Sequence, residues 1–162
     1  MIFVTVGTQY FDELIDEVDR LAGLGAFGQP VLAQIGLAKR KPKNVDYVIF
    51  DKNMLQTARG ADMIITHAGT GSLCEFITLG RPFIAVVNDT KAGNHQLEFL
   101  EHLSSLYDFC WICSPRDLEQ ALPHARPATP LSKTAEGMLA ADIRAFLKAR
   151  LAPQFSSPSV TT

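Results

Sequence analysis

The residue types best suited to binding an anion lie in one short run near the middle of the sequence. The run is His67, Ala68, Gly69, Thr70, Gly71 and Ser72. An apolar stretch, 62–66, precedes it and predicts a buried strand that ends at His67. The two glycines predict a turn with positive φ and close backbone approach, and Ser72 predicts the start of a helix. Because free N–H groups at a helix N-terminus favour anions, the run predicts a phosphate-binding turn.

The same residues have a purely structural interpretation. Ser72 and Glu75 have the spacing of a capping box, in which each side chain accepts a hydrogen bond from the first turn of the helix. A histidine that closes a strand, such as His67, is often only a satisfied core residue. The spacing of the glycines matches neither the Walker loop nor the G-x-G-x-x-G fingerprint, so a different class of nucleotide site is indicated.

Strand-like and helix-like segments alternate around this run. The alternation predicts an α/β fold with a single Rossmann-like, doubly wound parallel sheet. The expected strands are 2–6, 31–35, 47–50, 63–66, 83–87 and 109–112, and the expected helices are 11–24, 54–60, 72–79 and 95–106. Ligands in such sheets bind beyond the carboxyl ends of the strands. We therefore expect one crevice to collect Gly7, Phe50, His67 and Asn88.

The last third of the chain is less informative. A short helix is expected over 114–122, and prolines make 123–130 a connector that cannot be regular helix. An amphipathic helix is predicted over 134–151. The expected organisation is one domain, 1–152, followed by a flexible tail, 153–162, that is rich in Ser, Thr and Pro.

Length, charge and cysteine content narrow the class of protein. The 162 residues, 47% of them hydrophobic, suit one ordinary core but not two Rossmann-like domains. A formal net charge of −2 gives no general indication of nucleic-acid binding. A local basic loop near residue 40 is expected either to be solvated or to face a partner or anionic lipid headgroups. No signal peptide or membrane span is evident, so a cytoplasmic chain is expected. The loop contains Lys39, Arg40, Lys41 and Lys43.

The three cysteines are expected to be reduced thiols. Cys110 and Cys113 have C-x-x-C spacing, but they lie along a predicted strand rather than at a helix N-terminus, where a redox pair belongs. Both are therefore predicted to be core cysteines. One such pair without further ligands is also poor evidence for zinc, and no metal site is predicted.

Several segments, taken in order, resemble the donor-binding half of glycosyltransferase family 28. They are the run 67–72 with Glu75, Gly80-Arg81-Pro82, Val86-Val87-Asn88, Asn94-His95-Gln96, and an N-terminal segment, 3–8, with Phe11, Asp12 and Leu14. The resemblance extends over residues 1–112. It is strongest to stand-alone subunits, such as the small catalytic chain of the dolichol-linked N-acetylglucosaminyltransferase and exopolysaccharide glycosyltransferase subunits of the PssE type.

The resemblance implies a fold equivalent to the C-terminal half of a GT-B glycosyltransferase and a role for each part of the site. The glycine run would hold the donor diphosphate, and Glu75 the ribose, since a carboxylate accepts from two vicinal hydroxyls. Phe50 and Met54 would lie near the uracil. The implied donor-binding residues are Gly7, Thr8, Phe50, Met54, His67, Ala68, Gly69, Thr70, Gly71, Ser72, Glu75, Asn94, His95 and Gln96.

The implied reaction moves a hexosyl unit from a UDP-sugar to a lipid-linked acceptor in polysaccharide or glycolipid biosynthesis. His95 and Gln96 are the implied catalytic residues, whereas Asn94 also suits a helix N-cap. The family usually has an acidic residue where this chain has Gly93. No tightly bound cofactor is implied, and the general base is expected on a membrane-anchored, acceptor-binding partner subunit, with His67 and His95 as alternatives. The other interpretation is a catalytically silent UDP-sugar-binding or regulatory module.

Overall fold

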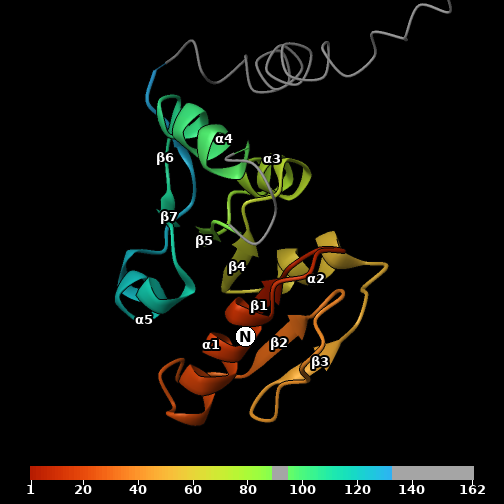
Figure 1. Ribbon diagram of the computed structural model, residues 1–162. Helices are drawn as coiled ribbons and strands as arrows, with labels where there is room; N and C mark the ends of the chain where they lie inside the picture. Colours follow the sequence, from red (N-terminus) through yellow and green to blue (C-terminus); the bar gives the residue numbers. More distant parts are fainter. Residues whose placement is uncertain (89–94, 133–162) are drawn as a thin grey trace, which may run out of the picture.

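A six-stranded parallel sheet organises the chain (Figure 1). The computed structural model describes residues 1–88 and 95–132. In the sheet the strand order is β3-β2-β1-β4-β5-β7. The bounds are β1 (Ile2–Thr5), β2 (Val31–Gln34), β3 (Asp46–Val48), β4 (Met63–His67), β5 (Phe83–Val86) and β7 (Cys110–Ile112). This order places the N-terminal strand in the interior of the sheet, between β2 and β4.

Helices cover both faces of the sheet, because successive residues of each buried strand point to opposite sides. Ile2, Val4 and Val6 pack on one face with α1 and α5. Phe3 and Ile64 pack on the other face with α2, α3 and α4. The helices are α1 (Asp12–Gly23), α2 (Met54–Gly60), α3 (Thr70–Leu79), α4 (His95–Ser104) and α5 (Leu118–Ala121). The two apolar layers explain why strands such as β1 and β5 are continuous hydrophobic runs.

The predicted fold class is confirmed, and the expected strands and helices are found within a few residues of their predicted bounds. A second, two-stranded antiparallel sheet was not predicted; it pairs β6 (Tyr107–Asp108) with β8 (Thr129–Pro130). The connector 123–130 therefore ends in a short strand, after two single-turn 3₁₀ helices at Pro115–Asp117 and Leu122–His124. The expected helix 134–151 and tail 153–162 lie outside the described residues.

The amino-terminal edge of the sheet is closed by the first residue. The N-terminal ammonium of Met1 forms an ion pair with Asp62, and the Asp62 N–H donates to the Met1 carbonyl at 2.9 Å. Both residues precede strands that run parallel to each other. Met1 therefore lies at the edge of the sheet opposite the carboxyl ends of the strands.

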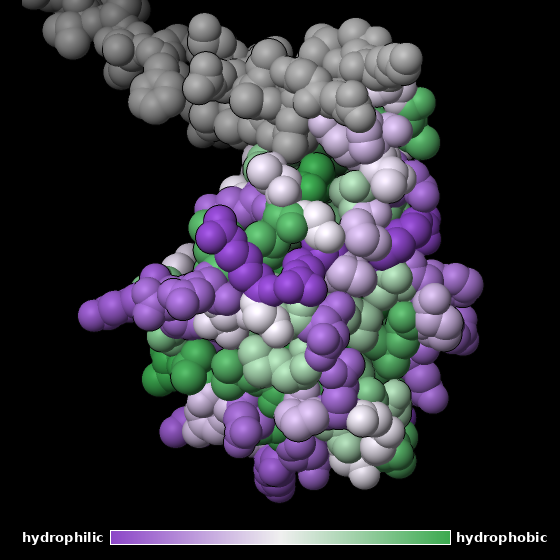
Figure 2. All heavy atoms as spheres, turned by 180° about the vertical axis from the view of Figure 1, so that it is seen from behind, coloured by the Kyte–Doolittle hydropathy of each residue, from purple (hydrophilic) through white to green (hydrophobic). Residues whose placement is uncertain are grey.

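Strand β3 forms one edge of the sheet and is exposed along its whole length. Apolar side chains on it and just beyond it, among them Val48 and Ile49, are 36% and 62% exposed. Seen from behind, hydrophobic residues reach the surface along this side of the molecule (Figure 2, lower left). The exposed strand explains why the predicted range 47–50 shifted to 46–48, since there is no burial on two faces to define its end.

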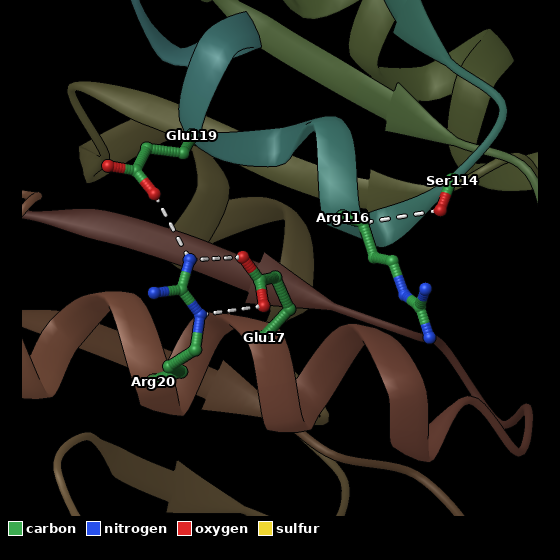
Figure 3. A network of polar contacts seen from close by, with 5 residues as sticks. All are labelled: Glu17, Arg20, Ser114, Arg116 and Glu119. Atoms are coloured by element: carbon green, nitrogen blue, oxygen red, sulfur yellow. Dashed lines mark hydrogen bonds and ion pairs between the residues drawn. The ribbon is translucent and has the colours of Figure 1, made fainter.

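A polar network joins α1 to α5. Arg20 on α1 donates to both carboxylate oxygens of Glu17 at 2.7 and 3.0 Å and to Glu119 at 3.1 Å (Figure 3). Ser114 accepts from the Arg116 N–H at 3.3 Å beside it. Arg20 and Glu119 are exposed and Glu17 is half-buried, so these ion pairs add little to the stability of the fold.

The basic loop is held against α1 by carboxylates. Asp12, which is 6% exposed, accepts from the Arg40 N–H at 3.0 Å, and Asp19 accepts from the N–H groups of Lys43 and Asn44. Lys39 lies over the Tyr10 ring at 5.3 Å from its centroid. The basic side chains of the loop are exposed, while hydrogen bonds to the two aspartates hold its backbone. Burial raises the pKa of the Asp12 carboxyl, but hydrogen bonds to it, first from the Arg40 backbone, outweigh burial and lower it overall.

Asp12→Asn is expected to lower the free energy of unfolding by about 1–3 kcal/mol at pH 7, because charge-assisted hydrogen bonds are lost. A carboxyl whose folded pKa is lowered stabilises the fold above its unfolded pKa and loses that effect as pH falls through the folded value. The difference from wild type should therefore shrink in acid. Urea titrations between neutral and acidic pH measure it. Asp16→Asn, which removes only the exposed ion pair with Arg40, is the control, and an equal loss there would contradict the assignment.

The cysteine prediction was half right. Cys110 is buried in β7, but Cys113 is exposed just beyond it, where the chain leaves the sheet. Burial raises the pKa of the Cys110 thiol. Strand β7 forms the second edge of the sheet and ends at Ile112, so Cys113 lies beyond the strand and outside the core.

Candidate functional site

The carboxyl ends of the parallel strands meet at one edge of the sheet. The segments that follow β1, β3 and β4 contain the predicted site residues Gly7, Phe50 and Gly69, and Asn88 follows β5. This is the edge at which open α/β sheets bind ligands. The strand topology therefore places these segments at one edge. Of the four residues expected in one crevice, Gly7 and Phe50 line the same pocket, whereas His67 is buried at the end of β4 and Asn88 is not among the residues that line it.

A pocket of about 590 Å³ opens between the segments that follow β1 and β3. Its volume falls within the range of ligand sites, about 300–1,000 Å³. Four predicted donor-binding residues line it, and Arg59 and Lys52 add positive charge. Those four are Gly7, Thr8, Phe50 and Met54. Phe50 is 58% exposed, so its ring is available for contact with a ligand.

Hydrogen bonds hold the walls of this pocket. Gly7, at φ +59°, donates its N–H to the Thr5 hydroxyl at 3.0 Å, and the Met54 sulfur lies 3.9 Å from that hydroxyl. Asp51 accepts from the Asn53 N–H at 2.7 Å and from the Thr57 hydroxyl at 2.5 Å. These contacts fix the two loops without a ligand, which lowers the cost of binding one.

The glycine run forms the start of α3, but two residues earlier than expected. The helix begins at Thr70 and not at Ser72, and Gly69 is its N-cap with φ −77° and ψ 130°. Positive φ was predicted at Gly69 and Gly71, and neither residue adopts it. No side chain caps α3, so the capping-box interpretation is wrong. An extended Gly69 starts the helix early, so Ser72 lies inside its first turn, where backbone N–H groups lack partners within the helix.

The position of the His67 ring explains why glycine is needed at both Gly7 and Gly69. The side chain is buried at the end of β4, 5% exposed. A Cβ at Gly69 would lie 2.2 Å from His67 Nε2, and a Cβ at Gly7 would lie 3.0 Å from Cε1. Ala68, which lies between His67 and Gly69 in the sequence, is also buried, and its N–H donates to the Val86 carbonyl at 2.8 Å. The imidazole therefore packs against both glycine turns.

Glu75 lies in a neighbouring pocket of about 550 Å³ between α2 and α3. The pocket shares Leu55 and Arg59 with the first one, so the two adjoin along α2. Glu75 is exposed, while burial raises the pKa of the adjacent Cys74 thiol to about 11. Cys74 is therefore protonated at neutral pH and unsuited to nucleophilic chemistry.

Gln96 is tied to the same edge of the sheet. Its side-chain oxygen accepts from the Asn88 N–H at 2.9 Å, and the Asn88 amide donates to the Tyr10 carbonyl at 2.9 Å. These bonds connect α4, the end of β5 and the loop after β1. Asn94 lies outside the described residues, and of His95 only the backbone position, at the start of α4, is described.

Two residues with clear structural roles were missed by sequence reasoning. Gln34, 1% exposed at the end of β2, and Asp51, in the loop after β3, both line the first pocket. The sequence signal for Gln34 was a polar residue at the end of an otherwise apolar strand of the sheet.

A third pocket, of about 460 Å³, lies away from this site, between α1 and the 3₁₀ turn that starts at Pro115, beside Arg20 and Arg116.

Within 1–88 and 95–132, no cluster of His, Cys, Asp or Glu is arranged to hold a metal ion. Across the same residues, no helix combines the length and apolar character required to span a bilayer.

Residues 1–143 match the glycosyltransferase family 28 C-terminal domain, so the chain belongs to this family. Among its relatives is the UDP-N-acetylglucosamine transferase subunit ALG13 of Homo sapiens, 32% identical over 115 residues, which cover 63% of this chain and 10% of the relative. The ALG13 subunit of Candida albicans is 38% identical over 82 residues, which cover 48% of this chain and 28% of the relative. The chain thus spans only a fraction of the length of these relatives.

Solved structures support the same fold. An NMR solution structure of ALG13 superposes with a TM-score of 0.52 at 23% identity, covering 78% of this chain and 87% of that one. The crystal structure of the glycosyltransferase SnogD from Streptomyces nogalater superposes with a TM-score of 0.50 at 20% identity, covering 89% of this chain and 38% of that one. The fold is that of the C-terminal half of a GT-B glycosyltransferase.

Proposed function

We propose that this chain is the donor-binding subunit of a two-component transferase that moves a hexosyl unit from a UDP-sugar to a lipid-linked acceptor. The observation that carries the proposal is a nucleotide-sized pocket at the carboxyl edge of a family 28 sheet, whose wall residue Gly7 packs against His67 together with Gly69, the N-cap of α3. The pocket would take the uridine, and the helix N-terminus the diphosphate. The pathway would be polysaccharide or glycolipid biosynthesis.

Each predicted residue takes a role in the donor complex. Phe50 and Met54 would contact the uracil, and Glu75, exposed in the adjoining pocket, would accept from the ribose hydroxyls. The first-turn N–H groups of α3 would bind the diphosphate, with Gly7 and Thr8 closing the site from the β1 turn. Asn94, His95 and Gln96 would face the sugar. The binding run is His67, Ala68, Gly69, Thr70, Gly71 and Ser72.

Departure of the nucleotide is the step that this chain would assist. Charge grows on the β-phosphate as the glycosidic bond breaks, and preorganised N–H groups at a helix N-terminus stabilise such charge. His95 and Gln96 are proposed as the residues nearest the reacting sugar. The base that deprotonates the acceptor would come from the partner, because His67 is buried beneath two glycine turns.

The partner would be a membrane-anchored subunit that binds the acceptor. The named relatives are themselves subunits of a UDP-N-acetylglucosamine transferase, which supports a two-chain enzyme. The proposed location is the inner face of a membrane, reached through that partner. The donor is a substrate, and no tightly bound cofactor is proposed.

Titration of the purified chain with UDP, followed by transfer assays with and without a membrane fraction, tests the proposal. We expect UDP binding, poor transfer by the chain alone and a large gain with the membrane fraction. GDP and ADP serve as controls for base selectivity. Absence of UDP binding would overturn the donor site, full turnover alone would overturn the two-component scheme, and binding with no turnover in any fraction would favour a silent UDP-sugar-binding module.

Gln96→Glu is expected to lower transfer about tenfold while leaving UDP affinity and the melting temperature close to wild type. The substituted side chain still accepts from the Asn88 N–H but has no amide hydrogens to donate to a sugar hydroxyl. Gln96→Met, which removes both functions, should lower stability as well. Transfer is measured in the reconstituted pair. Equal losses in UDP binding and transfer would place Gln96 at the nucleotide or in the fold instead.

A further inference from the structure

Gln34 is a buried polar side chain at the wall of the nucleotide-sized pocket. It is the last residue of β2, it is 1% exposed, and it lines the pocket between the β1 turn and the β3 loop. A buried amide is costly unless both of its ends are hydrogen-bonded. The partners of Gln34 therefore show what holds it in place.

Both ends of the Gln34 amide bond to the backbone, and each bonds to a different loop. Nε2 donates to the Gly7 carbonyl at 2.9 Å, and Oε1 accepts from the Asp51 N–H at 3.1 Å. The orientation of the amide is fixed, because a carbonyl can only accept and an N–H can only donate. Gln34 thus spans the two walls of the pocket.

Each wall is braced separately, and Gln34 links the two walls through hydrogen bonds to the backbone of both, beside the longer contact of the Thr5 hydroxyl with the Met54 sulfur at 3.9 Å. The Gly7 turn is closed by Thr5, and Gly36, at φ +55°, packs so closely that a Cβ there would lie 2.8 Å from the Gly7 carbonyl. The β3 loop is closed by the Asp51 carboxylate, which accepts from Asn53 and Thr57. The hydrogen bonds within each brace do not cross from one loop to the other, whereas those of Gln34 do.

We propose that Gln34 is a positioning residue that sets the separation of the two pocket walls, and through it the affinity and the base selectivity of nucleotide binding. It acts through Gly7 and Asp51, since both ends of its amide are engaged with the backbone. The proposal rests on the proposed function, because the pocket is taken as the nucleoside site.

Two substitutions separate a positioning role from a packing role. Gln34→Met keeps the length of the side chain and removes both hydrogen bonds. Gln34→Glu accepts from Asp51 at any pH, but it donates to the Gly7 carbonyl only when its carboxyl is protonated. Burial beside a carbonyl raises the pKa of that carboxyl. Acid should therefore restore the link in Gln34→Glu and not in Gln34→Met.

The measurements are the dissociation constants of UDP and CDP for wild type and both variants between mildly acidic and mildly alkaline pH. Dissociation constants are compared with those of wild type at each pH, because the other ionisable groups near the pocket, His67 and Asp51 among them, and the ligand are the same in all three proteins. Lys52 and Arg59 also lie at the pocket and are the same in all three proteins. Melting temperatures are recorded in parallel.

We expect UDP affinity to fall about tenfold in Gln34→Met at every pH, with weaker discrimination against CDP. In Gln34→Glu the loss should be similar at high pH and should diminish toward low pH. Wild-type affinity and selectivity in both variants, or equal losses in both at every pH, would overturn the proposal. A lower melting temperature with unchanged affinity would show a packing role only.

Hydrogen exchange in the wild-type chain tests the link without any substitution. The Asp51 amide should be protected in the absence of nucleotide, because Gln34 accepts from it. Rapid exchange of this amide would contradict the proposal even if the variants do not fold. Failure of wild type to bind UDP would reject the proposed function, whereas intact wild-type binding with unaffected variants would reject only the role of Gln34.

Discussion

Replacing Gly69 with alanine is expected to lower the free energy of unfolding by about 1–3 kcal/mol and to abolish measurable UDP binding. The added Cβ would lie 2.2 Å from the buried His67 ring, so either the imidazole or the N-cap of α3 must move. Moving the N-cap displaces the N–H groups proposed to hold the diphosphate. Thermal unfolding and UDP titration measure the two effects.

Gly71→Ala is the matched control for the loss of stability, because no atom lies within 4 Å of a Cβ at that position. Gly71 is within α3 and lacks positive φ, so alanine should stabilise the chain by about 0.5–1 kcal/mol. The new methyl group would occupy the open space proposed for the diphosphate, and UDP affinity should fall. Stability and affinity that rise together would contradict a phosphate site there, and a Gly69→Ala chain as stable as wild type would contradict the packing of His67.

Glu75→Gln is expected to reduce UDP affinity by about 1.5–3 kcal/mol, because a charge-assisted hydrogen bond to the ribose is lost. Glu75 is exposed in the pocket between α2 and α3, and no side chain caps α3. The melting temperature should therefore stay close to that of wild type. Titrations with UDP measure the loss.

Glu101→Gln provides the comparison for Glu75, since Glu101 is also an exposed helical carboxylate but lines none of the three pockets described. Its UDP affinity should be unchanged. Wild-type affinity in Glu75→Gln would remove Glu75 from the donor site, and a loss of stability with affinity intact would give it a structural role instead.

The sheet could be predicted from the sequence because its strands are buried on both faces. Runs such as 2–6 and 83–87 are apolar at every position or nearly so, and only a covered parallel sheet accommodates them. Strands β6 and β8 have two residues each and no periodicity to detect. They are defined by tertiary contacts, including the ion pair of Arg126 with Asp108 at 2.7 Å.

The edge of the sheet that gathers the candidate residues could be predicted from the sequence, but the local geometry of those residues could not. Topology alone places Gly7, Phe50 and the glycine run at one edge, so their proximity followed from the strand pattern. The start of α3 depended on an extended Gly69, and the role of Gln34 depended on which loops meet across β2. Both are properties of the assembled sheet, and neither produces a local signal.

The position of Met1 has a practical consequence for handling the protein. Its ammonium pairs with Asp62 at the amino-terminal edge of the sheet, whereas the candidate site lies beyond the carboxyl ends of the strands. A biosensor surface coupled through an N-terminal affinity tag would therefore hold the molecule on the side opposite the candidate site, which would face the flowing solution. The tag would remove the exposed ion pair between the Met1 ammonium and Asp62, which should change the free energy of unfolding only slightly.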